Sequence, residues 1–377
     1  MKTAAVICEY NPFHNGHKYQ LDTARKMTGC DGVVALMSGS FVQRGDFAIY
    51  PKEVRAEAAL KNGADLVIEN PAVFTLRSAE GYADAAIYTL SKFNCIDYLF
   101  FGAECKELEK LETIAELFAC ETDEFKAVMA TELSKGLAFA TARSRAAARM
   151  LGVWVNDVLK EPNNLLAIEY LKAIKRQNSS LKPVLIQRKG VGHNSGVANG
   201  EYASASFIRE ELLKQNNLST LVPRSAFECY KNVPVFNSNA AEKAIISALS
   251  LMPPEIIARV PDISEGLENK IKTEVMKNNS LDELISAVKS KRYAYSRIKR
   301  ALLCAYLKID ESDAKMVPQY IKPLMFNQAG QSILSSARKK AELPLAKSAS
   351  PILKNEKAMQ IWKRELEFER VYRLFYC

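Results

Sequence analysis

The chain has 377 residues, of which 48% are hydrophobic and 25% charged, and these proportions argue against a disordered or fibrous protein. The first apolar run, residues 4–8, is too short for a signal peptide, and no stretch approaches the ~20 apolar residues of a membrane span. We therefore expect a cytoplasmic protein with no membrane partner. Lys and Arg number 52 against 43 Asp and Glu, and the net charge of +9 favours a polyanionic partner without proving one.

The first hundred residues alternate strand-like and helical patterns. Apolar runs predict strands at residues 4–10, 32–39, 64–71 and 96–104, and amphipathic runs predict helices at residues 16–29, 51–63 and 78–94. This repeated order with short connections predicts an α/β fold, a Rossmann-like doubly wound parallel sheet with helices on both faces. Ligands of such sheets bind at the carboxyl ends of the strands.

The rest of the chain divides into two further regions. Residues 105–180 have a helical pattern, a strand is predicted from Pro183, and a loop followed by a helix is predicted from Ser204. Beyond residue 225, amphipathic runs alternate with breaks that contain proline. The length permits two domains, and we expect an α/β domain at residues 1–225 and a mainly α-helical domain at residues 226–377.

The eight cysteines include no CxxC pair and have no histidine nearby at the spacing of metal ligands. Neither a zinc site nor a framework of disulfides is indicated by this pattern, so we expect reduced, structural thiols and no metal held by side chains.

Two of the three histidines, His14 and His17, flank Gly16 directly after the first predicted strand. A loop between a strand and a helix is a ready anion site, because free amides of the helix N-terminus point at the ligand. Imidazoles there can donate hydrogen bonds to phosphate oxygens as negative charge builds up. The alternative is a pair of histidines that cap or pack the helix. The third histidine, His193, lies in a glycine-rich stretch and is interpreted as a loop residue.

The HNGH sequence at residues 14–17 resembles the HxGH signature of the nucleotidylyl transferase superfamily. Members of this superfamily activate a substrate by attack on the α-phosphate of a nucleoside triphosphate and release pyrophosphate. A second phosphate-binding signature of the superfamily opens a late helix, and Ser204, Ser206 and Arg209 in "ASASFIRE" resemble it. Two signatures in the expected order are more specific than either alone.

Further motifs narrow the resemblance to the bacterial tRNA(Met) cytidine acetate ligase family. They are "NPFHNGH", "MSGSFVQRGDFAI", "NGADLVIENP", "FFGAE", "EPNNLLAIEYLKAI" and "ASASFIRE", and they cover residues 1 to about 210. The chain departs from the family pattern at Asn70, Ala103 and Ala167, where leucine, serine and glycine are usual. None of these changes removes a group that the chemistry obviously needs.

The resemblance implies catalytic roles for His14, His17 and Arg209, and it implies an ATP site. The residues that it assigns to ATP are Ile7, Cys8, Glu9, Tyr10, Asn11, Pro12, Phe13, His14, Asn15, Gly16, His17, Lys18, Tyr19, Gln20, Gly102, Asn163 or Asn164, Arg188, Ser204 and Ser206. The pattern does not distinguish Asn163 from Asn164, and a Pro-Asn-Asn sequence before an apolar helix is also a good helix start.

The same resemblance implies a ligase that forms acetyl-adenylate from acetate and ATP, with Mg²⁺ as the phosphate counterion. The acetyl group then passes to N4 of the wobble cytidine of elongator tRNA(Met). The residues leave two alternatives open: a small-molecule nucleotidylyltransferase of coenzyme biosynthesis, or a non-catalytic RNA-binding protein. The acids accepted, the general base for the amine and the oligomeric state are not indicated.

Two basic segments have possible roles in binding. Arg44, beside Gln43 in the loop after the second strand, is a candidate to orient a carboxylate substrate through paired hydrogen bonds, although a surface turn explains it nearly as well. Residues 289–308 are basic with interleaved tyrosines, and on a helix Arg292, Lys299 and Arg300 with Tyr293 could hold RNA phosphates and stack on a base. The alternative is a solvated charged face over a packed core.

Overall fold

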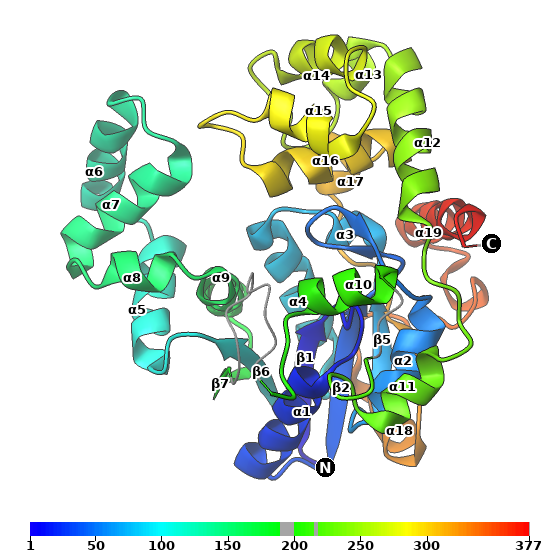
Figure 1. The fold of residues 1–377 in the computed structure, drawn as a ribbon. Helices are drawn as coiled ribbons and strands as arrows, with labels where there is room; N and C mark the ends of the chain where they lie inside the picture. The colour runs from blue at the N-terminus through cyan, green and yellow to red at the C-terminus, as the bar shows by residue number, and fades with distance from the viewer. Residues whose placement is uncertain (189–199, 215–217, 377) are drawn as a thin grey trace.

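The computed structural model describes residues 1–188, 200–214 and 218–376. At its centre lies a six-stranded sheet in the order β7-β6-β1-β2-β5-β8 (Figure 1). Neighbouring strands are parallel except β8, which pairs antiparallel with β5 at one edge. The order of the parallel strands is that of a doubly wound Rossmann sheet, as the sequence predicts. The strands are β1 (Thr3–Cys8), β2 (Gly32–Ser38), β5 (Leu66–Asn70), β6 (Tyr98–Ala103), β7 (Lys182–Gln187) and β8 (Lys322–Phe326).

Helices cover both faces of this sheet, and β2 is buried along its whole length as a result. Val33 and Ala35 belong to the apolar cluster on one face, and Val34 and Leu36 belong to the cluster on the other. A strand buried on both sides is therefore apolar without interruption. The first face carries α1 (Asn15–Thr28), α2 (Lys52–Leu60) and α11 (Arg224–Tyr230), and the second carries α4 (Ala79–Phe93), α5 (Leu108–Ala119), α9 (Pro162–Arg176) and α18 (Gln328–Lys340).

Two groups of helices extend beyond the sheet (Figure 1). One lies beyond α5 and consists of α6 (Asp123–Ser134), α7 (Phe139–Leu151) and α8 (Val155–Leu159). The other, here called the helical part, comprises α12 (Ser238–Leu251), α13 (Pro254–Ile257), α14 (Leu267–Val275), α15 (Leu281–Val288), α16 (Tyr295–Leu307) and α17 (Glu311–Ala314). None of the helices in the described ranges is both long and apolar enough to cross a membrane.

The remaining elements connect these groups. A short hairpin of β3 (Phe41–Val42) and β4 (Asp46–Phe47) follows β2, and α3 (Ala72–Thr75) follows β5. Helix α10 (Ala205–Leu213) precedes α11, and a 3₁₀ turn (Ser350–Ile352) leads into the C-terminal helix α19 (Glu356–Leu374). Phe41 and Phe74 share one apolar cluster with α12, α14, α15, α16 and α19. The helical part is thus packed on the α/β part through a continuous core.

The expected division at residues 225 and 226 needs a correction, because the chain returns to the sheet after the helical part. Strand β8 pairs with β5, and α18 packs on β2 and β5, so the assignment of these two elements to a separate helical domain is wrong. Strand β8 is short and contains Pro323, which lacks the N–H of a central strand and is tolerated at a sheet edge. A short strand with a proline gives little strand signal in the sequence.

Five buried or half-buried charges join the C-terminal helix to the sheet. Lys52 Nζ of α2 lies 2.6 Å from Glu69 Oε1 and 3.1 Å from Glu369 Oε2, and Lys322 Nζ of β8 lies 2.7 Å from Glu69 Oε2. Glu365, one turn before Glu369 on α19, faces the same group. Glu369 also pairs with Arg373 Nε at 2.8 Å, so Glu365 is the one of these three carboxyl groups that forms no ion pair within the described residues.

The uncompensated carboxyl group is that of Glu365. Burial and the nearby Glu69 carboxylate raise the pKa of Glu365 to about 7, whereas the two lysines lower the pKa of Glu69 to about 2. A neutral Glu365 avoids both the cost of a buried, unpaired charge and the repulsion from the Glu69 carboxylate.

Glu365→Gln is expected to stabilise the fold in a pH-dependent way. The pKa of Glu365 is higher in the folded chain than in the unfolded chain, so its ionisation opposes folding. This opposition is absent below the ordinary pKa of 4.5 and reaches its full size above about 7. We expect the gain of the variant over the wild type to grow to about 3 kcal/mol between those limits. Urea unfolding at a series of pH values measures it, and a gain that does not change with pH contradicts this account.

Candidate functional site

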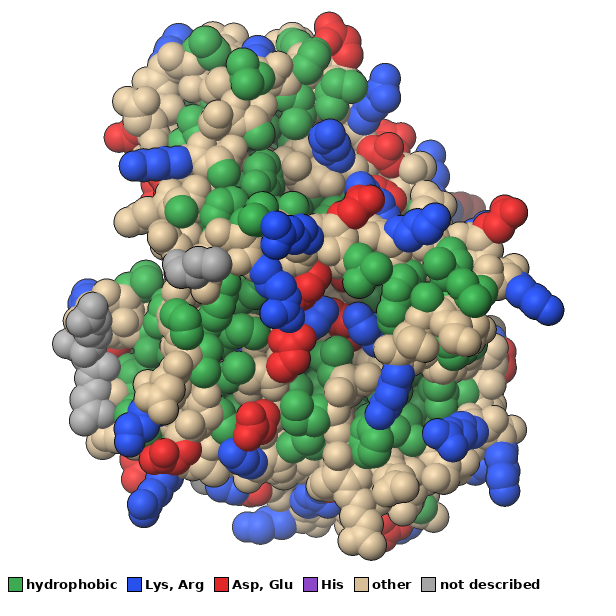
Figure 2. Space-filling model, turned by 90° about the vertical axis from the view of Figure 1, so that its right-hand side faces the viewer, with side chains coloured by type: hydrophobic (Ala, Val, Ile, Leu, Met, Phe, Trp, Pro, Cys, Tyr) green, Lys and Arg blue, Asp and Glu red, His purple; other side chains and the backbone are tan. Residues whose placement is uncertain are grey.

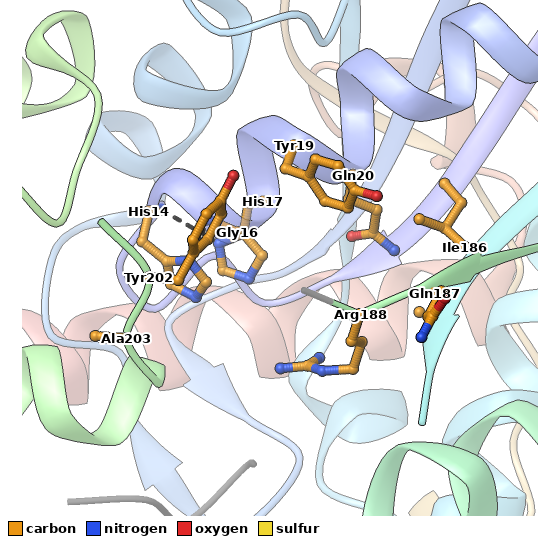
Figure 3. A pocket seen from close by; sticks show the side chains of 11 residues that line it. His14, Gly16, His17, Tyr19, Gln20, Ile186, Gln187, Arg188, Tyr202 and Ala203 are labelled. Carbon is orange, nitrogen blue, oxygen red and sulfur yellow. Dashed lines mark hydrogen bonds between the residues drawn. The ribbon is translucent and has the colours of Figure 1, made fainter. Parts of the chain in front are cut away.

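The two histidines of the HNGH sequence begin α1 and accept backbone hydrogen bonds. His14 is the N-cap residue, and its Nδ1 accepts the N–H of Gly16 at 3.1 Å. Nδ1 of His17 accepts the N–H of His14 at 3.3 Å, and the rings stack with centroids 3.7 Å apart (Figure 3). A neutral imidazole whose Nδ1 accepts carries its proton on Nε2. Capping therefore fixes the tautomer and leaves each ring with an Nε2–H donor.

Both rings are neutral at physiological pH. Burial, with smaller contributions from Arg188 and Arg209, lowers the pKa of His14 to about 3. Burial also lowers the pKa of His17 well below its usual value, and His14 and Arg188 add to this effect. Neutral Nε2–H groups can donate hydrogen bonds to a phosphate without acting as a proton relay. The capping interpretation and the functional one are thus compatible.

A cavity of about 530 Å³ opens at the carboxyl ends of β1 and β6. This is the size of a small-molecule site. It extends from the histidines past Glu9 to Gln43 and Arg44 on the β3–β4 hairpin, and to Ser296 and Arg300 on α16. A smaller pocket adjoins it beside the same histidines, between Tyr19, Gln187 and Tyr202 (Figure 3). The site is thus bordered by both the sheet and the helical part.

Most residues assigned to ATP by resemblance line these two cavities. They are Ile7, Cys8, Glu9, Tyr10, Asn11, His14, Gly16, His17, Tyr19, Gln20, Gly102, Asn163, Arg188, Ser204 and Ser206, and the catalytic candidate Arg209 lines the larger cavity as well. The structure thereby brings together side chains from β1, α1, β6, α9 and α10. The assignment of these residues to ATP stays a prediction.

Five residues of that assignment do not line the cavities. Phe13 is buried in the apolar core, and Pro12 beside it is buried as well. The Asn15 side chain donates to the carbonyls of Glu201 and Thr220. Lys18 pairs with Asp22 on the surface of α1, and Asn164 is buried.

The two asparagines left undistinguished by the sequence have different contacts. Asn164 Oδ1 accepts the backbone N–H groups of Glu104 and Cys105, both at 2.9 Å, so this side chain joins α9 to the end of β6. Asn163 lines the cavity, donates to Glu104 and accepts from Arg188 at 3.4 Å. The geometry therefore favours Asn163 as the residue available to a ligand.

A close contact with Arg188 explains the glycine at position 102. A Cβ atom at this position would lie 3.2 Å from Cγ of Arg188, closer than most real contacts. The missing side chain lets Arg188 extend across the end of β6 toward the histidines (Figure 3).

Arg209 and the serines before it connect α10 to the loop after β1. Ser204 caps α10 by accepting the N–H of Phe207 at 3.1 Å. Arg209 Nη1 donates to the carbonyl of Asn11 at 2.8 Å, and Nη2 lies 3.4 Å from Ser206 Oγ. The guanidinium thus contributes positive charge to the same cavity as the histidines.

Two further groups of residues around the site are not marked by any sequence motif. An apolar wall of Tyr82, Phe101, Leu166 and Tyr170 lines the cavity, and the spacing of these residues on α4, β6 and α9 is indistinguishable from that of core residues. Arg55 is fully buried and donates to the carbonyls of Glu9, Ser38, Gly39 and Tyr50. A charged residue on the apolar face of α2 is the one sequence signal that marks it.

The basic stretch at residues 289–308 is bound mainly within the protein. Tyr293 is buried, and Arg300 is buried and paired with Asp262. Lys299 pairs with Asp46 at 2.5 Å, and the exposed Arg292 pairs with Glu265. The prediction that Tyr293 and Arg300 form an exposed RNA-binding face is wrong, because the tyrosine packs in the core and the arginine holds the turn at Asp262. His193 lies outside the residues that the structure describes.

Comparison with known proteins agrees with this architecture. Residues 1–377 match the family described as HIGH Nucleotidyl Transferase. A tRNA(Met) cytidine acetate ligase of Caldanaerobacter subterraneus subsp. tengcongensis is 38% identical over 394 residues, which covers 100% of this chain and 96% of the relative. The enzyme of the same name from Clostridium kluyveri is 35% identical and covers 99% and 98%. The chain belongs to the tRNA(Met) cytidine acetate ligase family.

Solved structures of the ligase family extend the likeness to three dimensions. The apo crystal structure of Thermotoga maritima TmcAL superimposes with a TM-score of 0.95 at 30% identity, covering 100% of this chain and 95% of that one. The form bound with alpha-thio ATP gives a TM-score of 0.91 at 29% identity over the same shares. The fold predicted from the sequence is thus confirmed for this ligase-family member.

Substitutions at His17 are expected to separate its two nitrogens. His17→Ala should lower acetate-dependent turnover by about 10² or more, because one preorganised donor is lost. His17→Gln should keep more activity than His17→Asn, since the glutamine amide reaches the position of Nε2 and the asparagine amide that of Nδ1. Acetate-dependent exchange of pyrophosphate into ATP measures the first step, and circular dichroism checks folding. Equal activity of the Gln and Asn variants would contradict the tautomer that the capping geometry requires.

Proposed function

We propose that the protein uses ATP to activate acetate as acetyl-adenylate and transfers the acetyl group to N4 of the wobble cytidine of elongator tRNA(Met). The product is N4-acetylcytidine, and the reaction takes place in the cytoplasm. The relatives named tRNA(Met) cytidine acetate ligase support this proposal along the whole chain.

The observation that carries the proposal is the composition of the 530 Å³ cavity. Two neutral histidines present Nε2–H donors at its inner end, and Arg188 and Arg209 add positive charge beside them. Such a set of donors suits the α-phosphate and the departing pyrophosphate of ATP. The same cavity continues to Ser296 on α16, so a second substrate can approach from the side of the helical part.

The chemistry explains the need for ATP. The N4 amine of cytosine is a weak nucleophile, because its lone pair is delocalised into the ring. Acetate is a poor acyl donor, because its carboxylate oxygen does not leave readily. Attack of acetate on the α-phosphate makes a mixed anhydride, in which AMP is a good leaving group, and pyrophosphate departs.

The residues around the cavity do not fit a magnesium site held by the protein. Among the described residues, no three His, Cys, Asp or Glu side chains are grouped as metal ligands, and the groups beside the histidines are arginines. Hard cations take oxygen ligands. Mg²⁺ would therefore arrive as a counterion of the nucleotide, and we assign no step of the reaction to it.

The tRNA is expected to contact both parts of the chain around the cavity. On the face drawn in Figure 2, Lys and Arg side chains are interspersed with Asp and Glu, including where the upper helical part meets the lower part. This face carries no uniformly basic stripe. Recognition by local contacts around the cavity mouth therefore fits this face better than binding along a basic stripe.

The reaction itself is the direct test. Protein, ATP, labelled acetate and elongator tRNA(Met) should yield labelled N4-acetylcytidine after digestion to nucleosides, with one AMP and one pyrophosphate formed for each acetyl group. A transcript with uridine at the wobble position is the matched control and should stay unlabelled. Absence of label in the cytidine transcript, with folded protein and intact ATP, would contradict the proposed function.

Arg44 is proposed to orient the acetate. It is exposed, lines the cavity, and forms no ion pair within the described residues. Arg44→Ala should raise the KM for acetate about tenfold or more, and Arg44→Lys should raise it less, because a guanidinium offers paired donors to a carboxylate. Steady-state pyrophosphate release measures this, with the KM for ATP as the control. If the KM for tRNA rises instead, Arg44 contacts RNA rather than acetate.

A further inference from the structure

Among the described residues, Glu9 is one of two carboxylates that line the large cavity. It follows the last residue of β1 and lines the large cavity between the histidine end and the β3–β4 hairpin. The side chain lies deep in the protein, yet part of it is open to the cavity.

The two carboxylate oxygens of Glu9 have unequal contacts. Oε1 accepts the backbone N–H of Gln43 at 2.8 Å, and the backbone carbonyl of Glu9 accepts from Arg55. Within the described residues, Oε2 has no hydrogen-bond partner and Glu9 forms no ion pair. The carboxylate is thus held at one oxygen and available at the other.

Other acidic residues near the site form ion pairs or hydrogen bonds with neighbouring side chains. Asp46, the second carboxylate that lines the cavity, pairs with Lys299 at 2.5 Å. Glu104 accepts from Asn163 and from the backbone N–H of Asn164. Glu69 lies between Lys52 and Lys322. Among these, Glu9 is the carboxylate that can take a proton inside the cavity.

We propose that Oε2 of Glu9 accepts the proton of the N4 amine during acetyl transfer, which makes Glu9 the catalytic base of the second step. This inference rests on the proposed function, because it presupposes a cytosine amine and an acyl-adenylate.

Acetyl transfer forms one bond to the carbonyl carbon and breaks another. The N4 lone pair attacks the carbonyl carbon of acetyl-adenylate, and a C–N bond forms. The bond between that carbon and the phosphate oxygen breaks, and its electron pair leaves with AMP. One N4 proton passes to Oε2 of Glu9, which becomes a neutral carboxylic acid and later releases the proton to water.

The surroundings of Glu9 make it a better base than an exposed carboxylate. Burial raises its pKa, although the hydrogen bond from Gln43 and the positive charges of Arg209, Arg44 and Arg55 act in the opposite direction. A base whose pKa is nearer to the working pH takes a proton more effectively. Cys8 and Tyr82 also lie near Glu9, and burial raises the pKa of both, which keeps them protonated.

The test separates the two half-reactions in the full-length protein. Hydroxylamine is a strong nucleophile that needs no base, so acetohydroxamate formation from ATP and acetate reports the first step alone. In Glu9→Gln acetyl transfer to tRNA should fall by about 10² to 10³, and the rate of acetohydroxamate formation should fall much less. Glu9→Asp, which keeps the carboxylate but retracts it, should retain more transfer than Glu9→Gln.

Glu57→Gln on the surface of α2 is the matched control for loss of one carboxylate, since Glu57 pairs with Lys61 and both are half-exposed. It should leave both rates unchanged. Transfer in Glu9→Gln at the wild-type rate would overturn the assignment and leave the departing AMP as the proton acceptor. An equal loss of both rates would also overturn it, because Glu9 would then act on the nucleotide. If the wild type makes acetohydroxamate but never acetylates tRNA, the proposed function itself fails.

Discussion

The site depends on one buried guanidinium. Arg55 is fully buried on α2, and it donates to four backbone carbonyls, those of Glu9, Ser38, Gly39 and Tyr50. Those carbonyls lie at the ends of β1 and β2 and before α2, where the chain leaves the sheet and cannot continue the ladder of hydrogen bonds. Burial lowers the pKa of Arg55, yet an arginine keeps its proton at any physiological pH. A single side chain therefore satisfies the backbone from which the cavity begins.

His14 and His17, which follow this part of the backbone, have both a structural and a chemical role. Each ring uses Nδ1 to close the first turn of α1, and this leaves Nε2–H as the group that can reach a ligand. Their low pKa values follow from burial and from the arginines around the cavity, which are the same groups that suit phosphate. The helix start and the anion site are thus one arrangement, and a substitution at either histidine affects both.

The helical part completes the site because it is packed firmly against the α/β part. Its core is continuous with Phe41 and Phe74 of the α/β part, and Lys299 of α16 pairs with Asp46 of the β3–β4 hairpin. Gly45 at the tip of this hairpin has a φ of +82°, and a Cβ there would lie 2.5 Å from the Arg300 backbone. Only glycine fits such a contact, so the hairpin that carries Arg44 and holds Glu9 is fixed against α16.

The sequence by itself determined the α/β fold, the parallel and doubly wound type of sheet and the place of the histidine pair, because these follow from local patterns: apolar runs, helix periods and a short motif after a strand. It also indicated the second signature at Ser204 and Arg209. Only the tertiary structure decided which asparagine faces the cavity, that β8 joins the sheet, and that Tyr293 and Arg300 are internal. It also decided that, among the described residues, Glu9 forms no ion pair, whereas Asp46 pairs with Lys299 and both carboxylate oxygens of Glu104 accept hydrogen bonds. These facts depend on contacts between residues far apart in the chain, and local patterns carry no information about such partners.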